Sequence, residues 1–197
     1  MDPLKGKRIA IYGGSFDPVH NAHIKIAETV LGQGRIDCLI FLPSARSPLK
    51  QCGPVASDAD RLKMLELATG EQPRFSVDSS AIETGGVSYT IDWVLNFKAR
   101  HPSDSLFWIL GADQFEQLDR WREIDNLAKL VSFIVIARPS YSLEKKPNAI
   151  IDFMHIEMPL LNESSSSIRE DCRNSQSIMG RVPPTVQAFI SKESLYK

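Results

Sequence analysis

Two histidines spaced three residues apart are the side chains in this sequence that point most directly to chemistry. His20 and His23 lie in the stretch GGSFDPVHNAH, which runs from Gly13 to His23 and directly follows a run of apolar residues. At positions i and i+3 of a helix, two imidazoles share one face, and the positive end of the helix lies behind them. Such a pair can clamp an anion, and a chain of phosphate groups is the ligand that suits it best.

Other interpretations of this stretch have less support. It is neither a GxGxxG motif nor a Walker A loop, which argues against hydride transfer to NAD and against P-loop hydrolysis. A zinc site would need a third suitable ligand nearby, and the HExxH spacing is absent. An isolated HxxH is most often ordinary helix surface. Here, however, it follows an apolar run, two glycines and an Asp-Pro pair, and the glycines let backbone N–H groups approach a ligand closely.

The composition is that of a globular protein without a nucleic-acid partner. The 197 residues carry 23 Lys and Arg against 24 Asp and Glu, a formal net charge of -1, and 43% are hydrophobic. This length predicts a single domain over residues 1–197. The lack of a basic excess argues against nucleic-acid binding.

The location expected for this protein is the cytoplasm. No apolar run is long enough for a signal peptide or a membrane span. The cysteines, Cys38, Cys52 and Cys172, are odd in number and form no CxxC pair, which fits a reducing compartment and argues against a zinc site.

The elements that must position the histidines form an alternating pattern along the chain. Strands are expected at residues 8–12, 38–42, 75–77, 106–110, 131–137 and around 153–158. Strands that are apolar on both faces and separated by helices indicate a parallel sheet covered on both sides. The predicted fold is therefore α/β, with a Rossmann-like, doubly wound and mainly parallel sheet.

The predicted helices are recognised by their periodicity and their ends. One follows the histidines, and a second begins after the N-cap Ser57 and ends at Gly70. A third spans Thr90–Arg100, with its inward face expected at Ile91, Val94, Leu95 and Phe97. A C-terminal helical portion is expected from about residue 164, and segment 140–150 is expected to be a loop.

Ligands of such sheets bind at the carboxyl ends of the strands. In this sequence those ends are residues 13–17, 43–50, 111–113 and 138. The chemically distinctive residues therefore fall where the fold would place a ligand.

Five segments together resemble one enzyme family. GGSFDPVHNAH resembles the signature of the HxGH nucleotidyltransferases. The others are similar to segments of the bacterial nicotinate mononucleotide adenylyltransferase family: SYTIDWVL (88–95), GADQFEQLDRW (111–121), IARPS (136–140) and SSSSIR (164–169). The resemblance spans nearly the whole chain in the family's order. It implies an enzyme of NAD biosynthesis that transfers the adenylyl group of ATP to nicotinate mononucleotide, giving nicotinate adenine dinucleotide and pyrophosphate.

The resemblance also implies a role for individual residues. His20 and His23 would be catalytic, stabilising the charge that develops on the α-phosphate. ATP would be bound by Gly14, Ser15, Phe16, Gly111, Asp113, Ser165, Ser166 and Arg169. The mononucleotide would be bound by Lys50, Thr90, Trp121, Arg122 and Arg138, with Trp121 stacked on the pyridine ring. No protein ligand for a metal is expected, because Mg²⁺ would be carried with ATP and pyrophosphate.

The charge of these residues suits the chemistry. Nucleotidyl transfer needs positioning and neutralisation of spread negative charge more than covalent help. The groups expected to supply positive charge are His20, His23, Lys50, Arg138 and Arg169.

The sequence departs from the family pattern at a few positions. Ala22 replaces the glycine of HxGH, and Leu49 stands where many members have a histidine. Glu163 replaces the isoleucine before the serine segment, and Ser166 replaces a threonine in it. None of these changes removes an expected catalytic group.

Two alternatives remain at this stage. One is a related transferase with the same nucleotide half-site, such as a pantetheine-phosphate adenylyltransferase or a cytidylyltransferase. The other is a nucleotide-binding regulator that kept the fold and lost turnover. The sequence also leaves open whether the protein forms a homo-oligomer.

Overall fold

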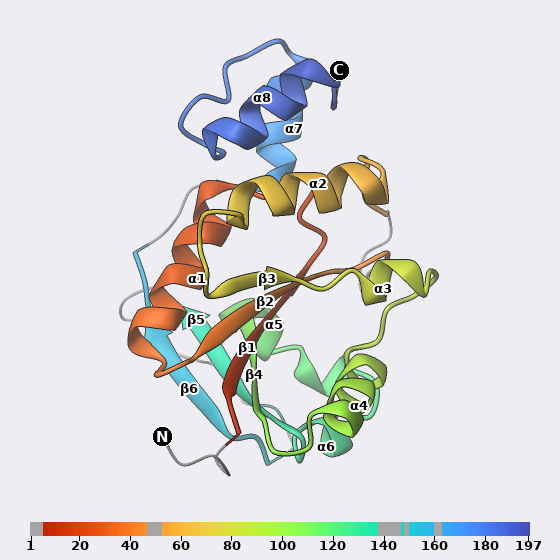
Figure 1. The fold of residues 1–197 in the computed structure, drawn as a ribbon, viewed down its shortest axis with the longest axis vertical. Coiled ribbons are helices and arrows are strands. Elements are labelled where there is room, and N and C mark those ends of the chain that lie inside the picture. The colour runs from red at the N-terminus through yellow and green to blue at the C-terminus, as the bar shows by residue number, and fades with distance from the viewer. Residues whose placement is uncertain (1–5, 47–52, 138–146, 148–149, 160–162) are drawn as a thin grey trace.

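A six-stranded sheet forms the centre of the molecule (Figure 1). The computed structural model describes residues 6–46, 53–137, 147, 150–159 and 163–197. The strands are β1 (Arg8–Gly14), β2 (Cys38–Pro43), β3 (Phe75–Val77), β4 (Ser105–Gly111), β5 (Val131–Ala137) and β6 (Phe153–Glu157). Their order is β3-β2-β1-β4-β5-β6, and every neighbouring pair is parallel. The predicted doubly wound parallel sheet is confirmed, with its switch point between β1 and β4.

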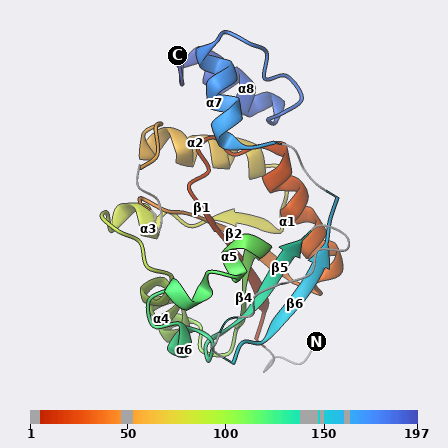
Figure 2. The ribbon, with the colours of Figure 1, turned by 180° about the vertical axis from the view of Figure 1, so that it is seen from behind.

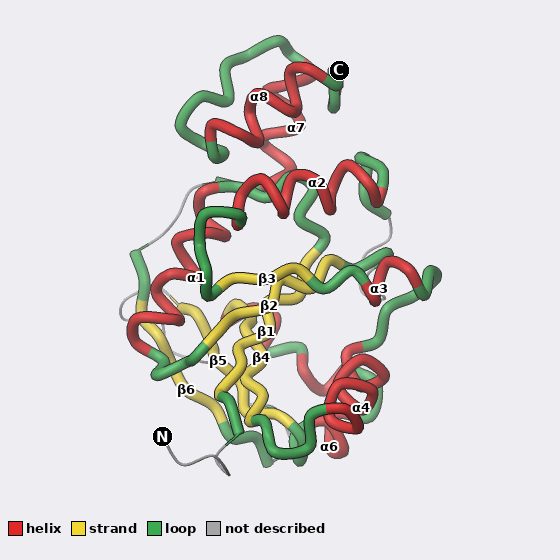
Figure 3. Tube along the Cα trace, viewed as in Figure 1, coloured by secondary structure: helices red, strands yellow, loops and turns green. Residues whose placement is uncertain are grey.

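Helices cover both faces of this sheet, as Figure 3 shows. One face packs against α1 (Asn21–Gln33) and α2 (Asp58–Thr69), and α7 (Ser165–Arg173) and α8 (Pro184–Lys192) extend the same apolar layer beyond α2. The other packs against α4 (Thr90–Arg100), α5 (Ala112–Phe115) and α6 (Ile124–Leu127). A short helix, α3 (Ser80–Glu83), and a 3-10 turn (Leu118–Arg120) complete the helical elements of the described residues.

Alternation along the strands explains why there are two apolar layers. Successive side chains of a strand point to opposite faces. On β1, Ala10 therefore packs in the layer with α1 and α2, while Ile9 and Ile11 pack in the layer with α4. Both layers are closed because the strands carry apolar residues on both sides.

One predicted helix end is confirmed, and one residue predicted to be buried is not. The Ser57 hydroxyl accepts a hydrogen bond from the Asp60 N–H at 3.1 Å, which confirms the predicted N-cap of α2. Leu95 was expected to be buried, and this is wrong, because the residue is 50% exposed. Trp93 is only 9% exposed, so the buried face of α4 includes the side of the helix that carries Trp93 and not the side that carries Leu95.

The C-terminal part of the chain holds two helices. Helices α7 and α8 lie beyond α2 in Figure 2, on the side away from β6. The Thr185 hydroxyl of α8 donates to the Leu67 carbonyl of α2 at 3.0 Å. None of the helices in the described ranges is long and apolar enough to cross a membrane. Most of the predicted loop 140–150 lies outside the described residues.

Candidate active site

Two cavities meet at the carboxyl end of β1. The larger has a volume of about 930 Å³ and is lined by the loop after β1 and by the starts of α1, α5 and α7. The smaller, of about 380 Å³, is lined by the loop after β1, by residues near the start of α4 and by residues 120–122, and its lining includes four aromatic and two arginine side chains. Four residues line both cavities: Gly13, Gly14, Ser15 and Gln114. A ligand in one cavity would therefore lie directly beside a ligand in the other.

At both glycines of this loop a side chain would crowd a neighbouring aromatic ring. A Cβ atom at Gly13 would lie 2.8 Å from the Trp108 ring, and one at Gly14 would lie 3.0 Å from the Phe16 ring. Phe16 itself has a positive φ of 46° and is 1% exposed. Its ring packs edge-on against Tyr12, so this buried side chain anchors the loop while the loop backbone lines the larger cavity.

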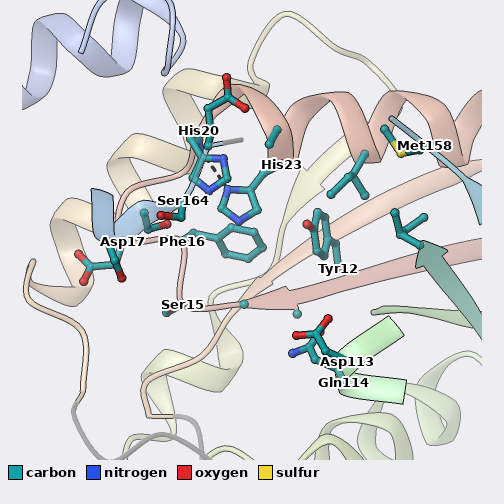
Figure 4. Close-up of a pocket in the computed structure, with 18 of the residues that line it drawn as sticks. Tyr12, Ser15, Phe16, Asp17, His20, His23, Asp113, Gln114, Met158 and Ser164 are labelled. Atoms are coloured by element: carbon teal, nitrogen blue, oxygen red, sulfur yellow. Dashed lines mark hydrogen bonds between the residues drawn. The ribbon is translucent and has the colours of Figure 1, made fainter. Parts of the chain in front are cut away.

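The structure brings the two histidines together, as expected. His20 is the N-cap of α1, and its ring stacks on that of His23 with centroids 3.6 Å apart. The backbone N–H of His20 donates to Nδ1 of His23 at 3.2 Å, the interaction dashed in Figure 4. Neutral His23 therefore carries its proton on Nε2.

The electrostatic state of His20 differs from the expectation. Burial, and secondarily the charge of Arg181, lower the pKa of His20 from its ordinary value of 6.5 to about 4. The expectation that His20 supplies positive charge is therefore wrong for the ligand-free protein, because at neutral pH the ring is uncharged. Its Nδ1 is a buried atom with no hydrogen-bond partner in the described part of the chain.

The start of α7 docks onto the loop after β1. Ser164 caps the helix by accepting the Ser167 N–H at 3.2 Å, and the Ser165 hydroxyl donates to the Pro18 carbonyl at 2.9 Å. Ser164, Ser165, Ser166 and Arg169 all line the larger cavity. The N-termini of α1 and α7 therefore open on the same space and direct the positive ends of their helix dipoles at it.

Asp113 lies across this cavity from the histidines, just after Gly111. Gly111 is the last residue of β4 and the N-cap of α5, and a Cβ there would lie 2.9 Å from Oδ1 of Asp113. Asp113 is exposed and lines the cavity, on the opposite side from His20 and His23 in Figure 4. The helix is thus capped by Gly111, and Asp113 is not its N-cap.

The smaller cavity has aromatic walls and a cationic edge. Trp121 is half-buried and packs edge-on against Trp108, with ring centroids 6.2 Å apart. Thr90, which also lines the cavity, is the first residue of α4. The Arg122 guanidinium lies 4.7 Å above the Tyr89 ring, and its Nη1 lies 3.5 Å from a carboxylate oxygen of Asp92.

Two of the expected mononucleotide contacts, Lys50 and Arg138, lie outside the described residues, as does Leu49. Their roles remain predictions. The other expected residues line one or both cavities, except Gly111, which lines neither, although its neighbours Ala112 and Asp113 line the larger one.

Sequence reasoning missed three residues that hold the site together. Asp17 and Arg61 are 2% and 0% exposed, and Tyr196 is 7% exposed. Nη1 of Arg61 donates to the carbonyls of Ser15 and Ser44 at 2.7 and 2.9 Å. The Asp-Pro pair in the signature was a signal for Asp17, but no local pattern marks Arg61 or Tyr196.

Known proteins resemble this chain over most of its length. The profile of the cytidylyltransferase-like family matches residues 11–171. The chain is 41% identical to the "Probable nicotinate-nucleotide adenylyltransferase" of Geobacillus kaustophilus, over 96% of this chain and 86% of that protein. It is 35% identical to the nicotinate-nucleotide adenylyltransferase of Bacillus subtilis, over 97% of this chain and 99% of that protein.

A solved structure has the same fold. It is the nicotinic acid mononucleotide adenylyltransferase of Plasmodium falciparum, complexed with NaAD. The TM-score is 0.75 at 24% sequence identity, over 96% of this chain and 97% of that one.

Proposed function

Because this chain belongs to the cytidylyltransferase-like family, and within it to the nicotinate-nucleotide adenylyltransferases, we propose that its two cavities hold the two substrates of one adenylyl transfer. ATP binds in the larger cavity and nicotinate mononucleotide in the smaller. The observation that carries this proposal is the wall shared by the two cavities, formed by Gly13, Gly14, Ser15 and Gln114. The two reacting phosphates meet there.

The larger cavity suits a nucleoside triphosphate. The N-termini of α1 and α7 direct their positive ends at it, and Arg169 adds a full charge at its edge. The hydroxyls of Ser165 and Ser166 serve the adenine end and the phosphates. The exposed carboxylate of Asp113 is an acceptor for ribose hydroxyls on the opposite wall.

The smaller cavity suits a pyridine ring with an acidic substituent. Trp121 offers an aromatic face for stacking. The carboxylate is received at the N-terminus of α4, where Tyr89 provides no side-chain cap, by the Thr90 hydroxyl and by backbone N–H groups near Arg122. Arg120 and Arg122 also line this cavity and favour an anion over the neutral amide of nicotinamide mononucleotide.

The reaction is a direct displacement at the α-phosphorus of ATP. A 5′-phosphate oxygen of the mononucleotide forms the new P–O bond, the bond from the α-phosphorus to the bridging oxygen breaks, and pyrophosphate leaves with both bonding electrons. No covalent enzyme intermediate forms. His20 and His23 donate hydrogen bonds to the phosphoryl oxygens as charge builds on them, from positions already fixed by the stacked geometry.

Mg²⁺ enters this reaction with ATP as part of the substrate. In the ranges that the structure describes, no group of three or more His, Cys, Asp or Glu side chains could hold a metal ion. The ion would be coordinated mainly by phosphate oxygens and water. Bound in that way, it neutralises charge on the pyrophosphate that leaves.

The test is Mg²⁺-dependent pyrophosphate release from ATP, with nicotinate and nicotinamide mononucleotides compared side by side and the dinucleotide product identified by mass. We expect rapid turnover with the acid and much slower turnover with the amide. Equal rates would contradict the carboxylate site at α4 and leave the transfer intact. No pyrophosphate from either, together with tight ATP binding, would favour a nucleotide-binding regulator.

A further inference from the structure

A buried carboxylate joins three distant parts of the chain beside the larger cavity. Asp17 is 2% exposed, and Oδ2 accepts the Val55 N–H at 2.7 Å. Its Oδ1 accepts the Ala56 N–H at 3.1 Å and the Tyr196 hydroxyl at 2.9 Å. The loop after β1, the segment before α2 and the segment after α8 are therefore fastened to one side chain.

Asp17 also contacts the guanidinium of Arg169, to which we assign a role in ATP binding. Nη1 of Arg169 donates to the Asp17 carbonyl at 2.7 Å and lies 3.6 Å from Oδ2 of the Asp17 carboxylate. Nη2 donates to the Ser166 hydroxyl at 3.3 Å. The Arg169 side chain remains 22% exposed, and this exposed part lines the larger cavity.

Tyr196 determines how firmly this carboxylate is held. Its hydroxyl is the one side-chain hydrogen-bond donor to the Asp17 carboxylate found in the described part of the chain, since the other two donors are backbone N–H groups. The Tyr196 ring is 7% exposed and packs in the core with α7 and α8. Burial and the negative Asp17 both raise the pKa of this hydroxyl, so it stays a donor at all working pH values.

We propose that Tyr196 and Asp17 are positioning residues for Arg169, so that a hydroxyl some twenty-seven residues further along the chain sets the affinity for ATP. The Tyr196 hydroxyl fixes the carboxylate, and the carboxylate and carbonyl of Asp17 fix the guanidinium at the cavity edge. Neither residue needs to touch the nucleotide. The inference rests on the proposed function only in taking ATP as the ligand of the larger cavity.

The test is Tyr196→Phe, which removes the hydroxyl and keeps the buried ring. We measure the Kd for ATP with Mg²⁺ by calorimetry, and separately kcat and KM for each substrate. We expect the Kd and KM for ATP to rise about three- to tenfold. The KM for the mononucleotide and kcat should change less than about twofold, since Trp121 and the histidines keep their places.

A double-mutant cycle shows whether the effect passes through Arg169. In the Arg169→Ala background, Tyr196→Phe should leave the Kd for ATP unchanged, because the group that it positions is absent. An effect of full size in that background would overturn the proposal. An unchanged Kd in Tyr196→Phe alone would overturn it equally.

Thr185→Val is the matched control for a general loosening of this region. Its hydroxyl ties α8 to the Leu67 carbonyl, away from both cavities. This variant should lower Tm as Tyr196→Phe does and leave the Kd for ATP as in the wild type. An equal rise in Kd would show that Tyr196 acts only through stability, against the proposal.

Binding and turnover separate this inference from the proposed function. If the wild type binds ATP without turning over either mononucleotide, the proposed reaction fails, while the Kd values still decide the role of Tyr196. If the wild type does not bind ATP, both are overturned.

Discussion

His20 and His23 stack with their ring planes 27° apart, and the backbone of the first donates to the ring of the second. The Phe16 ring packs edge-on against His23 at a centroid distance of 5.0 Å, so the pair is held from the side as well. The geometry favours at most one positive charge, because two imidazolium rings at this distance would repel each other. His20, whose pKa is lowered to about 4, is therefore the neutral member of the pair at neutral pH.

Replacing His20 by alanine should mainly slow the chemical step. We expect kcat to fall by about two to three orders of magnitude, the cost of losing one preorganised donor to a developing oxyanion, with a much smaller change in the KM for ATP. The measurement is steady-state pyrophosphate release. His155→Ala is the control, since that histidine is exposed on β6 and should keep the wild-type rate. A near-normal kcat in His20→Ala would remove His20 from the transition state.

The same histidine should make stability depend on pH. Its pKa is about 4 in the folded protein and 6.5 in its ordinary state, so the unfolded chain binds more protons between these values. The free energy of unfolding therefore rises with pH across this window and is lost as the pH falls from 6.5 toward 4. Between pH 7 and pH 5 this group should account for about 2 kcal/mol.

Urea denaturation at pH 7 and pH 5 measures that slope. His20→Asn, which cannot titrate there, should lose less stability over this range than the wild type, while His155→Asn should lose as much. NMR titration of the ring protons gives the pKa of His20 directly. A pKa near 6.5 in the folded protein would contradict the burial argument.

The sheet and the region of the site were predictable because both follow from local patterns. Strands that are apolar on both faces, such as Val131–Ala137, fit only a sheet covered on both sides. In a parallel sheet the carboxyl ends share one edge, which places Gly13 and Asp113 near each other although a hundred residues separate them. The fold therefore delivers most of the expected residues to the two cavities.

The supporting contacts could not be predicted, because their partners are set by tertiary packing. A tyrosine after a helix carries no sign that its hydroxyl will meet Asp17, far earlier in the chain. The low pKa of His20 depends in the same way on burial in the folded protein and on the charge of Arg181, far along the chain. The predicted burial of Leu95 was wrong for a related reason, since the bulk of Trp93 decides which side of α4 faces the core.

Arg61 should matter for stability far more than its place on a charged helix suggests. It is fully buried and its Nη1 donates to two carbonyls, those of Ser15 and Ser44, which connect α2 to the loop after β1 and to the end of β2. Arg61→Met keeps the apolar volume and leaves both carbonyls without this donor. We expect a loss of roughly 3 kcal/mol in the free energy of unfolding.

Urea denaturation compares this variant with Lys63→Met on the same helix. The Lys63–Glu66 ion pair is solvent-exposed on both sides, so breaking it should cost less than about 1 kcal/mol. Equal losses in the two variants would mean that the Arg61 hydrogen bonds contribute little.

Trp121 should govern the affinity for the mononucleotide without affecting ATP. Its ring forms part of the smaller cavity and of no wall of the larger one within the described residues. Trp121→Ala should raise the KM for nicotinate mononucleotide by about 10- to 100-fold through lost stacking and apolar contact, and leave the Kd for ATP unchanged. Trp121→Phe keeps an aromatic face and should recover most of the affinity. Steady-state kinetics and ATP calorimetry on both variants give the comparison. If alanine and phenylalanine were equally poor, the indole N–H, a buried donor with no partner among the described residues, would be the group that the ligand needs, and stacking would not explain the site.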